Sequence, residues 1–217
     1  MLSVSGGLKS KNKKSLMGNI IMNSNNVIII PGLGDDTNKL RIITNWWNKH
    51  GITPHIVSIG WHDQENFQQK LAKLVKTIDI LSSQETVSLI GTSAGASAAL
   101  NAFVKRRKKV YHVVNVCGRL RLGKYTGFRS FENRTSSSPA FKESVLLFES
   151  MESKLSKADR SRIMTVTPRF GDELVPRDTA ILEYAHNITI PTIEHGFSIA
   201  MALTIFAKPI IKFLTPE

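Results

Sequence analysis

Short apolar runs alternate along the chain with longer stretches of helical period. Val27-Ile28-Ile29-Ile30 is a run of four β-branched or apolar residues with no polar member. Such a run is typical of a strand that is buried on both faces, as in a parallel sheet. Five similar segments follow, and we expect strands at 55–58, 85–90, 110–116, 163–167 and 187–193.

The segments between these runs have apolar residues at spacings of three and four, which predicts amphipathic helices. The segment 38–50 places Leu40, Ile43 and Trp47 on one face, and Gly51 is suited to end it. Further helices are expected at 65–82, from Ala94 onward, at 141–155, at 177–185 and at 198–213. Strands separated by segments of helix length indicate parallel βαβ units.

The predicted fold class is therefore α/β, with a mostly parallel sheet of about six strands and helices on both faces. The whole chain of 217 residues is long enough to bury one hydrophobic core, and its composition shows no linker between domains. We therefore expect a single domain over 27–217. The regular alternation stops between 118 and 157, where Gly, Arg, Ser and Pro precede the next helix. An insertion of this length predicts a small cap over the sheet edge.

The composition is typical of an ordinary globular enzyme or binding domain, and we expect no targeting signal. Hydrophobic residues make up 41% of the chain and charged residues 21%. Cys117 is the single cysteine, so no internal disulfide is expected and a cytoplasmic location is predicted. No apolar run approaches the roughly 20 residues of a membrane span. Residues 1–26 are polar and lysine-rich, which predicts a basic tail and not a secretory signal.

The formal net charge is +12, with basic clusters at 105–109 and at 119–129. Such a surface predicts weak, salt-dependent contact with anionic surfaces. We favour the interpretation that the clusters are solvated loops, because no nucleic-acid motif accompanies the charge, and specific nucleic-acid binding is not expected. No metal-ligand spacing occurs, and the glycines at 91 and 95 lack the lysine of a phosphate loop. Neither a metal nor another cofactor is therefore predicted.

Gly91-Thr92-Ser93-Ala94-Gly95 fits G-x-S-x-G and lies between a predicted strand and a predicted helix. In that context the pattern marks a sharp turn that exposes a nucleophilic serine above the sheet edge. The backbone of such a turn is strained, and the two glycines remove Cβ atoms that would collide nearby. Ser93 is accordingly the candidate nucleophile.

A serine hydroxyl needs a base, and a carboxylate orients that base. After a G-x-S-x-G serine the partners follow in the order Asp or Glu, then His, which Asp172 and His195 satisfy. Both follow predicted strands and should emerge at the same edge as Ser93. Glu173 and Asp178 are alternative orienting carboxylates. His62 is the alternative base, although it precedes the serine.

Four stretches resemble the α/β-hydrolase superfamily: Pro31-Gly32-Leu33-Gly34, the serine turn, Gly171-Asp172-Glu173-Leu174-Val175-Pro176 and His195-Gly196. The resemblance implies a reduced, six-stranded member of that fold. It also implies Ser93 as nucleophile, His195 as base, Asp172 as orienting acid and an oxyanion hole from the backbone N–H groups of Leu33 and Ala94. Many relatives begin the first loop with His-Gly, where this chain has Pro31-Gly32. We assign Gly32, Trp61 and His62 to the substrate-binding pocket.

The leading hypothesis is a serine hydrolase that cleaves a carboxylic ester, thioester or amide of a small-molecule acyl substrate through an acyl-enzyme on Ser93. One alternative is a non-catalytic binding module on the same scaffold, which would use its basic surface. A third reading keeps the triad but transfers the acyl group to an alcohol or amine. The geometry of Ser93, Asp172 and His195 separates the first from the second.

Overall fold

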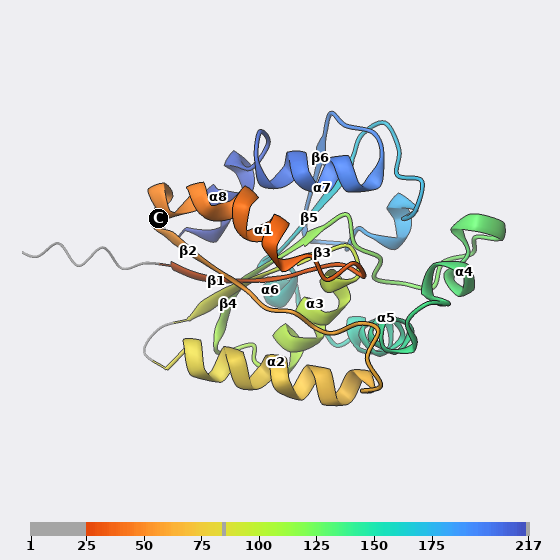
Figure 1. The fold of residues 1–217 in the computed structure, drawn as a ribbon, viewed down its shortest axis with the longest axis horizontal. Coiled ribbons are helices and arrows are strands. Elements are labelled where there is room, and N and C mark those ends of the chain that lie inside the picture. The colour runs from red at the N-terminus through yellow and green to blue at the C-terminus, as the bar shows by residue number, and fades with distance from the viewer. Residues whose placement is uncertain (1–24, 84–85, 216–217) are drawn as a thin grey trace, which may run out of the picture.

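A computed structural model describes residues 25–83 and 86–215 of the chain. The predicted tail at 1–26 lies outside these residues except for its last two, Asn25 and Asn26, which begin the first strand. The order of the elements along the chain follows the predicted alternation (Figure 1).

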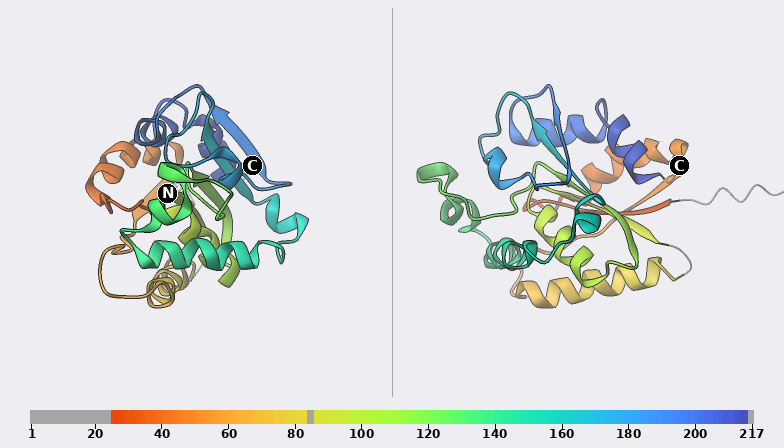
Figure 2. Two further views of the ribbon diagram at one scale, coloured as in Figure 1. Left: turned by 90° about the vertical axis from the view of Figure 1, so that its right-hand side faces the viewer. Right: turned by 180° about the vertical axis from the view of Figure 1, so that it is seen from behind.

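Six parallel strands form the sheet in the order β2-β1-β3-β4-β5-β6. Their bounds are β1 Asn25–Ile30, β2 Ile52–Ile56, β3 Val87–Thr92, β4 Val110–Val116, β5 Ile163–Pro168 and β6 His186–Ile190. The predicted fold class is confirmed. Because all strands run the same way, their carboxyl ends share one edge, at the right in Figure 1 and facing the viewer in Figure 2, left.

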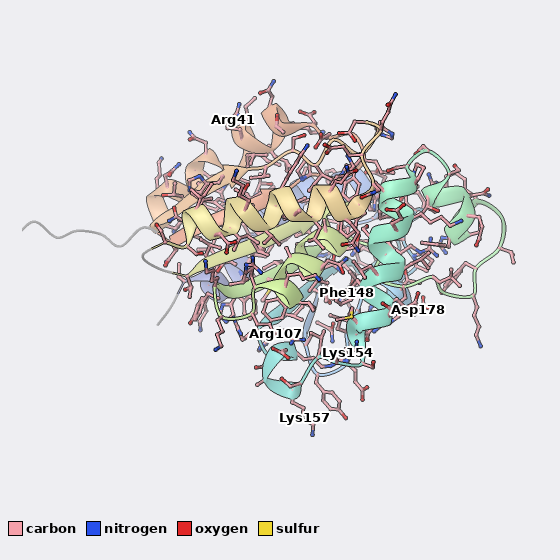
Figure 3. The ribbon with its side chains drawn as sticks, turned by 90° about the horizontal axis from the view of Figure 1, so that it is seen from below. Arg41, Arg107, Phe148, Lys154, Lys157 and Asp178 are labelled. Carbon is pink, nitrogen blue, oxygen red and sulfur yellow. The ribbon has the colours of Figure 1, made fainter. Side chains whose placement is uncertain are left out.

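Helices cover both faces of the sheet. One face carries α2 Phe67–Leu81, α3 Gly95–Lys105 and α5 Pro139–Glu152, which lie side by side when the molecule is seen from below (Figure 3). The other face carries α1 Thr37–Thr44, α7 His195–Leu203 and α8 Lys208–Leu214. The shorter elements are α4 Phe131–Thr135, α6 Lys157–Arg160 and the 3-10 turns η1 Asn45–His50, η2 Gly127–Arg129 and η3 Arg177–Thr179.

Two hydrophobic clusters, one on each side of the sheet, hold these layers together. Ile28 and Leu89 point toward the α2–α3–α5 side, whereas Ile29 and Ile90 point toward the α1–α7–α8 side. Successive residues of a strand face opposite ways, so the buried residues of β1 and β3 are mostly apolar on both faces. This burial on both faces explains the continuous apolar runs in the sequence.

Several predicted boundaries are wrong. The second strand spans Ile52–Ile56 and contains Pro54, which an edge strand tolerates because it needs no ladder donor on its open side. The single helix expected at 198–213 is two helices, because Pro209 opens α8 and cannot continue the hydrogen bonding of a preceding helix. The helix expected at 177–185 is only the turn η3.

Within the described residues, no single helix is long and apolar enough to cross a membrane. The pair α7 and α8 reaches that length and composition together, with a bend of 59° between the two helices. Both helices pack one side against the sheet core.

Candidate active site

Ser93 occupies the tight turn between β3 and α3, as the motif predicts. Its φ of 51° lies in the left-handed region, which costs a non-glycine residue of the order of 1–3 kcal/mol. The turn requires both neighbouring glycines. A Cβ on Gly91 would lie 2.3 Å from Ala96 Cα, and one on Gly95 would lie 2.2 Å from Ile30 O. The strained turn therefore depends on close backbone contact on both sides.

The three predicted residues meet at the carboxyl edge of the sheet. His195 Nε2 lies 2.8 Å from Ser93 Oγ, and His195 Nδ1 lies 2.8 Å from Asp172 Oδ2. With Nδ1 protonated, the imidazole donates to Asp172 and accepts the serine proton at Nε2. Asp172 and His195 are buried at 7% and 5% exposure, which shields the pair from water. The geometric condition that separates a catalytic triad from a bare scaffold is met.

Backbone groups fix the Asp172 carboxylate. Oδ1 accepts from Leu174 N–H at 2.9 Å and from Val175 N–H at 2.8 Å, which leaves Oδ2 for the imidazole. The two alternative carboxylates, Glu173 and Asp178, bind other groups. Glu173 accepts the backbone N–H of His195 at 3.0 Å, and Asp178 accepts the hydroxyl of Tyr125 at 2.6 Å. Glu173 therefore helps to hold the base, which sequence reasoning did not anticipate.

His195 is the first residue of α7, where a short loop from β6 turns into the helix. Glu194 precedes it with a φ of 76°, and its carboxylate accepts the N–H groups of Gly196 and Phe197. This cap at the helix start fixes the direction in which His195 leaves the backbone. The position differs from the expected loop, since the helix begins three residues earlier than predicted.

The two expected oxyanion donors are both available. Within the described part of the chain, neither Leu33 N–H nor Ala94 N–H has a hydrogen-bond acceptor. The loop that carries Leu33 approaches the nucleophile closely, because a Cβ on Gly32 would lie 2.8 Å from Ser93 Cβ. Only glycine fits there, and its backbone therefore lies directly beside the reacting hydroxyl.

The loop after β2 supports the loop that carries Leu33. The carboxylate of Asp35 accepts from Ser58 Oγ and, at 3.0 Å, from Gly60 N–H. His62 lies with Nε2 3.1 Å from Leu33 O and Nδ1 3.0 Å from Ser137 O, and it thereby links this loop to the segment just before α5. The fully buried Lys70 ammonium binds Gly60 O at 2.6 Å. His62 is thus a bridge between loops, and its predicted substrate contact stays a prediction.

Trp61 does not form the pocket wall that the sequence predicted. Its side chain is 1% exposed, its Nε1–H donates to Pro31 O at 3.1 Å, and its ring stacks with Phe67 and packs edge-on against Phe141. An indole buried on all sides belongs to the core. The wrong prediction came from the position of Trp61 after a strand, which does not show which way the side chain points.

An apolar cavity of about 160 Å³ lies beside the first loop. Its lining includes Gly32, Thr92, Gly196, the apolar side chains of Leu40, Ile43 and Ile199, and the charged residues Asp35, Asp36 and Lys39. Two of the lining residues adjoin Ser93: Thr92 precedes it in the sequence, and Gly32 contacts it in space.

Two further titratable side chains, His112 and Cys117, take no part in these contacts. His112 stacks on Phe213 at 4.1 Å between ring centres, and burial lowers the pKa of His112. Cys117 is 1% exposed, and burial raises the pKa of its thiol. The described residues contain no cluster of three or more His, Cys, Asp or Glu side chains able to hold a metal ion.

Several residues of the two basic clusters form ion pairs, so these clusters are not simply solvated loops. In the first, Arg106 and Lys109 both pair with Asp79 and Arg107 pairs with Asp159. In the second, Arg121 pairs with Glu152. Part of the positive charge is therefore held in ion pairs, which join the end of α3 to α2 and α6 and join Arg121 to the end of α5.

No protein-family model matches the sequence, and no curated protein matches it. Solved structures do. Est1E from Butyrivibrio proteoclasticus has a TM-score of 0.63 at 14% identity, covering 91% of this chain and 89% of that one. The Bacillus licheniformis lipase BlEst2 has a TM-score of 0.63 at 15% identity, covering 89% and 93%. Human thioesterase 2 has a TM-score of 0.58 at 14% identity, covering 88% and 96%. These likenesses span nearly the whole described chain and show that it has the α/β-hydrolase fold.

Proposed function

We propose that the protein is a serine hydrolase that cleaves a carboxylic ester, thioester or amide through an acyl-enzyme on Ser93. The observation that carries the proposal is the chain of two 2.8 Å contacts from Asp172 through His195 to Ser93 Oγ. The structural neighbours named as a lipase and a thioesterase support the same class of reaction.

The reaction follows from the positions of the groups. Ser93 Oγ attacks the carbonyl carbon while its proton passes to His195 Nε2. The carbonyl oxygen gains negative charge and is stabilised by the N–H groups of Leu33 and Ala94, which point from the first loop and the start of α3. The imidazolium then protonates the leaving group. Water, activated by the same imidazole, releases the acid from Ser93.

The cavity beside Gly32 favours a small apolar group on the substrate. At about 160 Å³ it has room for about five groups the size of a water molecule. A long alkyl chain would have to extend beyond it. We therefore expect short esters to be better substrates than long ones.

The proposal is tested with p-nitrophenyl esters from acetate to dodecanoate, using the full chain and the Ser93→Ala variant. The expected result is hydrolysis that is fastest for a short ester and that drops to background in the variant. Hydrolysis that persists unchanged in Ser93→Ala would refute the assignment. Circular dichroism of both proteins confirms that the variant is folded.

A further inference from the structure

A second cavity, of about 220 Å³, lies beside Asp172. Asp172 lines it, together with residues from the ends of β4 and β5, from the cap and from the loop before η3. The residues that matter here are Cys117, Tyr125, Arg129, Thr167, Arg169 and Arg177. The mechanism proposed above does not use this cavity.

Three arginines face this cavity without a carboxylate partner. Arg129, Arg169 and Arg177 form no ion pair among the described residues, in contrast to Arg106, which is paired with Asp79. The guanidinium group of Arg129 donates to the backbone oxygen of Asp172, which also lines the cavity. The side chains of Arg169 and Arg177 make no hydrogen bond within the described residues.

Two carboxylates next to these lining residues already have partners. Asp172 binds His195 and two backbone N–H groups, and Asp178 accepts the Tyr125 hydroxyl. Neither forms an ion pair with the three guanidinium groups. The cavity is therefore lined by more positive than negative charge.

A polar side chain that lines the cavity also lacks a partner. Thr167 is 3% exposed, and its Oγ1 has no hydrogen-bond partner. Most buried polar atoms in proteins are hydrogen-bonded, and those without a partner need an explanation. A ligand oxygen in this cavity would provide one.

The loop that carries Tyr125 and Arg129 is held by a buried cation. Arg119 is 1% exposed and donates to the backbone oxygens of Arg121, Leu122 and Arg129. It has no ion-pair partner among the described residues, although Asp178 and Glu132 act on it from a distance. This guanidinium holds the loop that carries Tyr125 and Arg129, two residues that line the cavity.

We propose that this cavity binds a carboxylate or phosphate group carried by the substrate. Guanidinium forks bind both groups through paired hydrogen bonds, which makes anion recognition the chemistry that fits three unpaired arginines. Neighbouring strands are about 4.8 Å apart, so the ends of β4 and β5 lie within about 10 Å of the strand that carries Ser93. The anionic group would sit that far from the cleaved bond. This inference rests on the proposed hydrolase function.

The first test measures binding directly. Glutarate and inorganic phosphate are titrated into the full chain by isothermal titration calorimetry, and then into the Arg169→Gln/Arg177→Gln variant. The control is Arg41→Gln/Lys76→Gln, which removes the same charge from exposed positions on α1 and α2; Arg41 is labelled in Figure 3. We expect saturable binding by the wild type and the control, and at least about tenfold weaker binding by the double arginine variant. The titration with the higher affinity shows whether the site prefers carboxylate or phosphate.

The second test measures selectivity. It compares kcat/KM for the p-nitrophenyl half-ester of glutaric acid with that for p-nitrophenyl valerate, which lacks the carboxylate. We expect the ratio to fall at least tenfold in the arginine variant and to stay the same in the control.

Three outcomes of these two tests decide whether the cavity binds an anionic group of the substrate. Arginine-dependent binding together with an arginine-dependent ratio supports the proposal. Hydrolysis of both esters without binding of either anion, or with a ratio equal in all three proteins, overturns it and leaves the hydrolase intact. Arginine-dependent binding without hydrolysis of any ester refutes the hydrolase and the substrate role together, and leaves only an anion site.

Discussion

Replacing Asp172 with asparagine should abolish most of the activity while preserving the fold, for a reason specific to this site. The oxygen Oδ1 accepts two backbone N–H groups, from Leu174 and Val175. In Asp172→Asn those donors require the amide oxygen, so the amide NH₂ must face His195 Nδ1. The imidazole then has to accept at Nδ1 and carry its proton at Nε2. In that tautomer it cannot take the proton of Ser93.

The size of the effect follows from this loss of the base. The same exchange in another serine-hydrolase triad lowers kcat by about 10⁴-fold, which corresponds to about 5 kcal/mol in the activation barrier. Stability should change little, because both backbone N–H groups keep an acceptor. By contrast, Asp172→Ala leaves both donors unpaired, and each should cost about 1–3 kcal/mol of unfolding free energy.

The assay is kcat for a short p-nitrophenyl ester, with urea unfolding of each protein measured in parallel. Asp79→Asn is the matched control, because the same exchange is made in a surface ion pair at the far end of α2. We expect Asp172→Asn to lose about four orders of magnitude, and the control to lose less than twofold. A tenfold loss or less in Asp172→Asn would show that the amide can turn or that another group orients His195, and the reasoning would be wrong.

Three other predictions concern the scaffold. Gly95→Ala should lower the unfolding free energy by about 3 kcal/mol, because the added Cβ would collide with backbone atoms. Gly34→Ala should be tolerated, because nothing lies within 4 Å of the added Cβ. Equal urea midpoints for the two variants would contradict this. Burial lowers the pKa of His112 from its ordinary value near 6.5, so the unfolded chain takes up a proton first and stability falls as pH drops below that value. His112→Phe should make the loss of unfolding free energy between pH 7.5 and pH 5 smaller, and an unchanged loss would count against burial as the cause. Iodoacetamide at pH 8 should label Cys117 only after denaturation, since burial raises the pKa of its thiol; mass spectrometry of native protein that shows full labelling would disprove this.

The triad could be predicted because its signals are local and the fold supplies the rest. A serine between two glycines, placed between a strand and a helix, has few other uses. Once the sheet is known to be parallel, residues that follow its strands must share one edge. That rule brought Asp172 and His195 to Ser93 across 79 and 102 positions of sequence, and it needed no side-chain detail.

The features that sequence reasoning missed depend on tertiary contacts. Trp61 follows a strand, as the triad residues do, but its ring points into the core. Arg119 looks like one member of a basic surface cluster, yet it is buried under three backbone carbonyls. The grouping of Arg129 with Arg169 and Arg177 joins segments 40 residues or more apart. Such groupings follow from how the cap folds back, which hydrophobic period does not encode.

The central claim is that Ser93 is the activated nucleophile of a working triad, and covalent labelling tests it most directly. The full chain is treated with a fluorophosphonate, and the adduct is located by peptide mass spectrometry, with Ser93→Ala, His195→Gln and Ser161→Ala run alongside. We expect one adduct, on Ser93, in the wild type and in Ser161→Ala, and none in the other two variants. A folded wild type that takes up no label, or that carries the label on a different serine, would contradict the account.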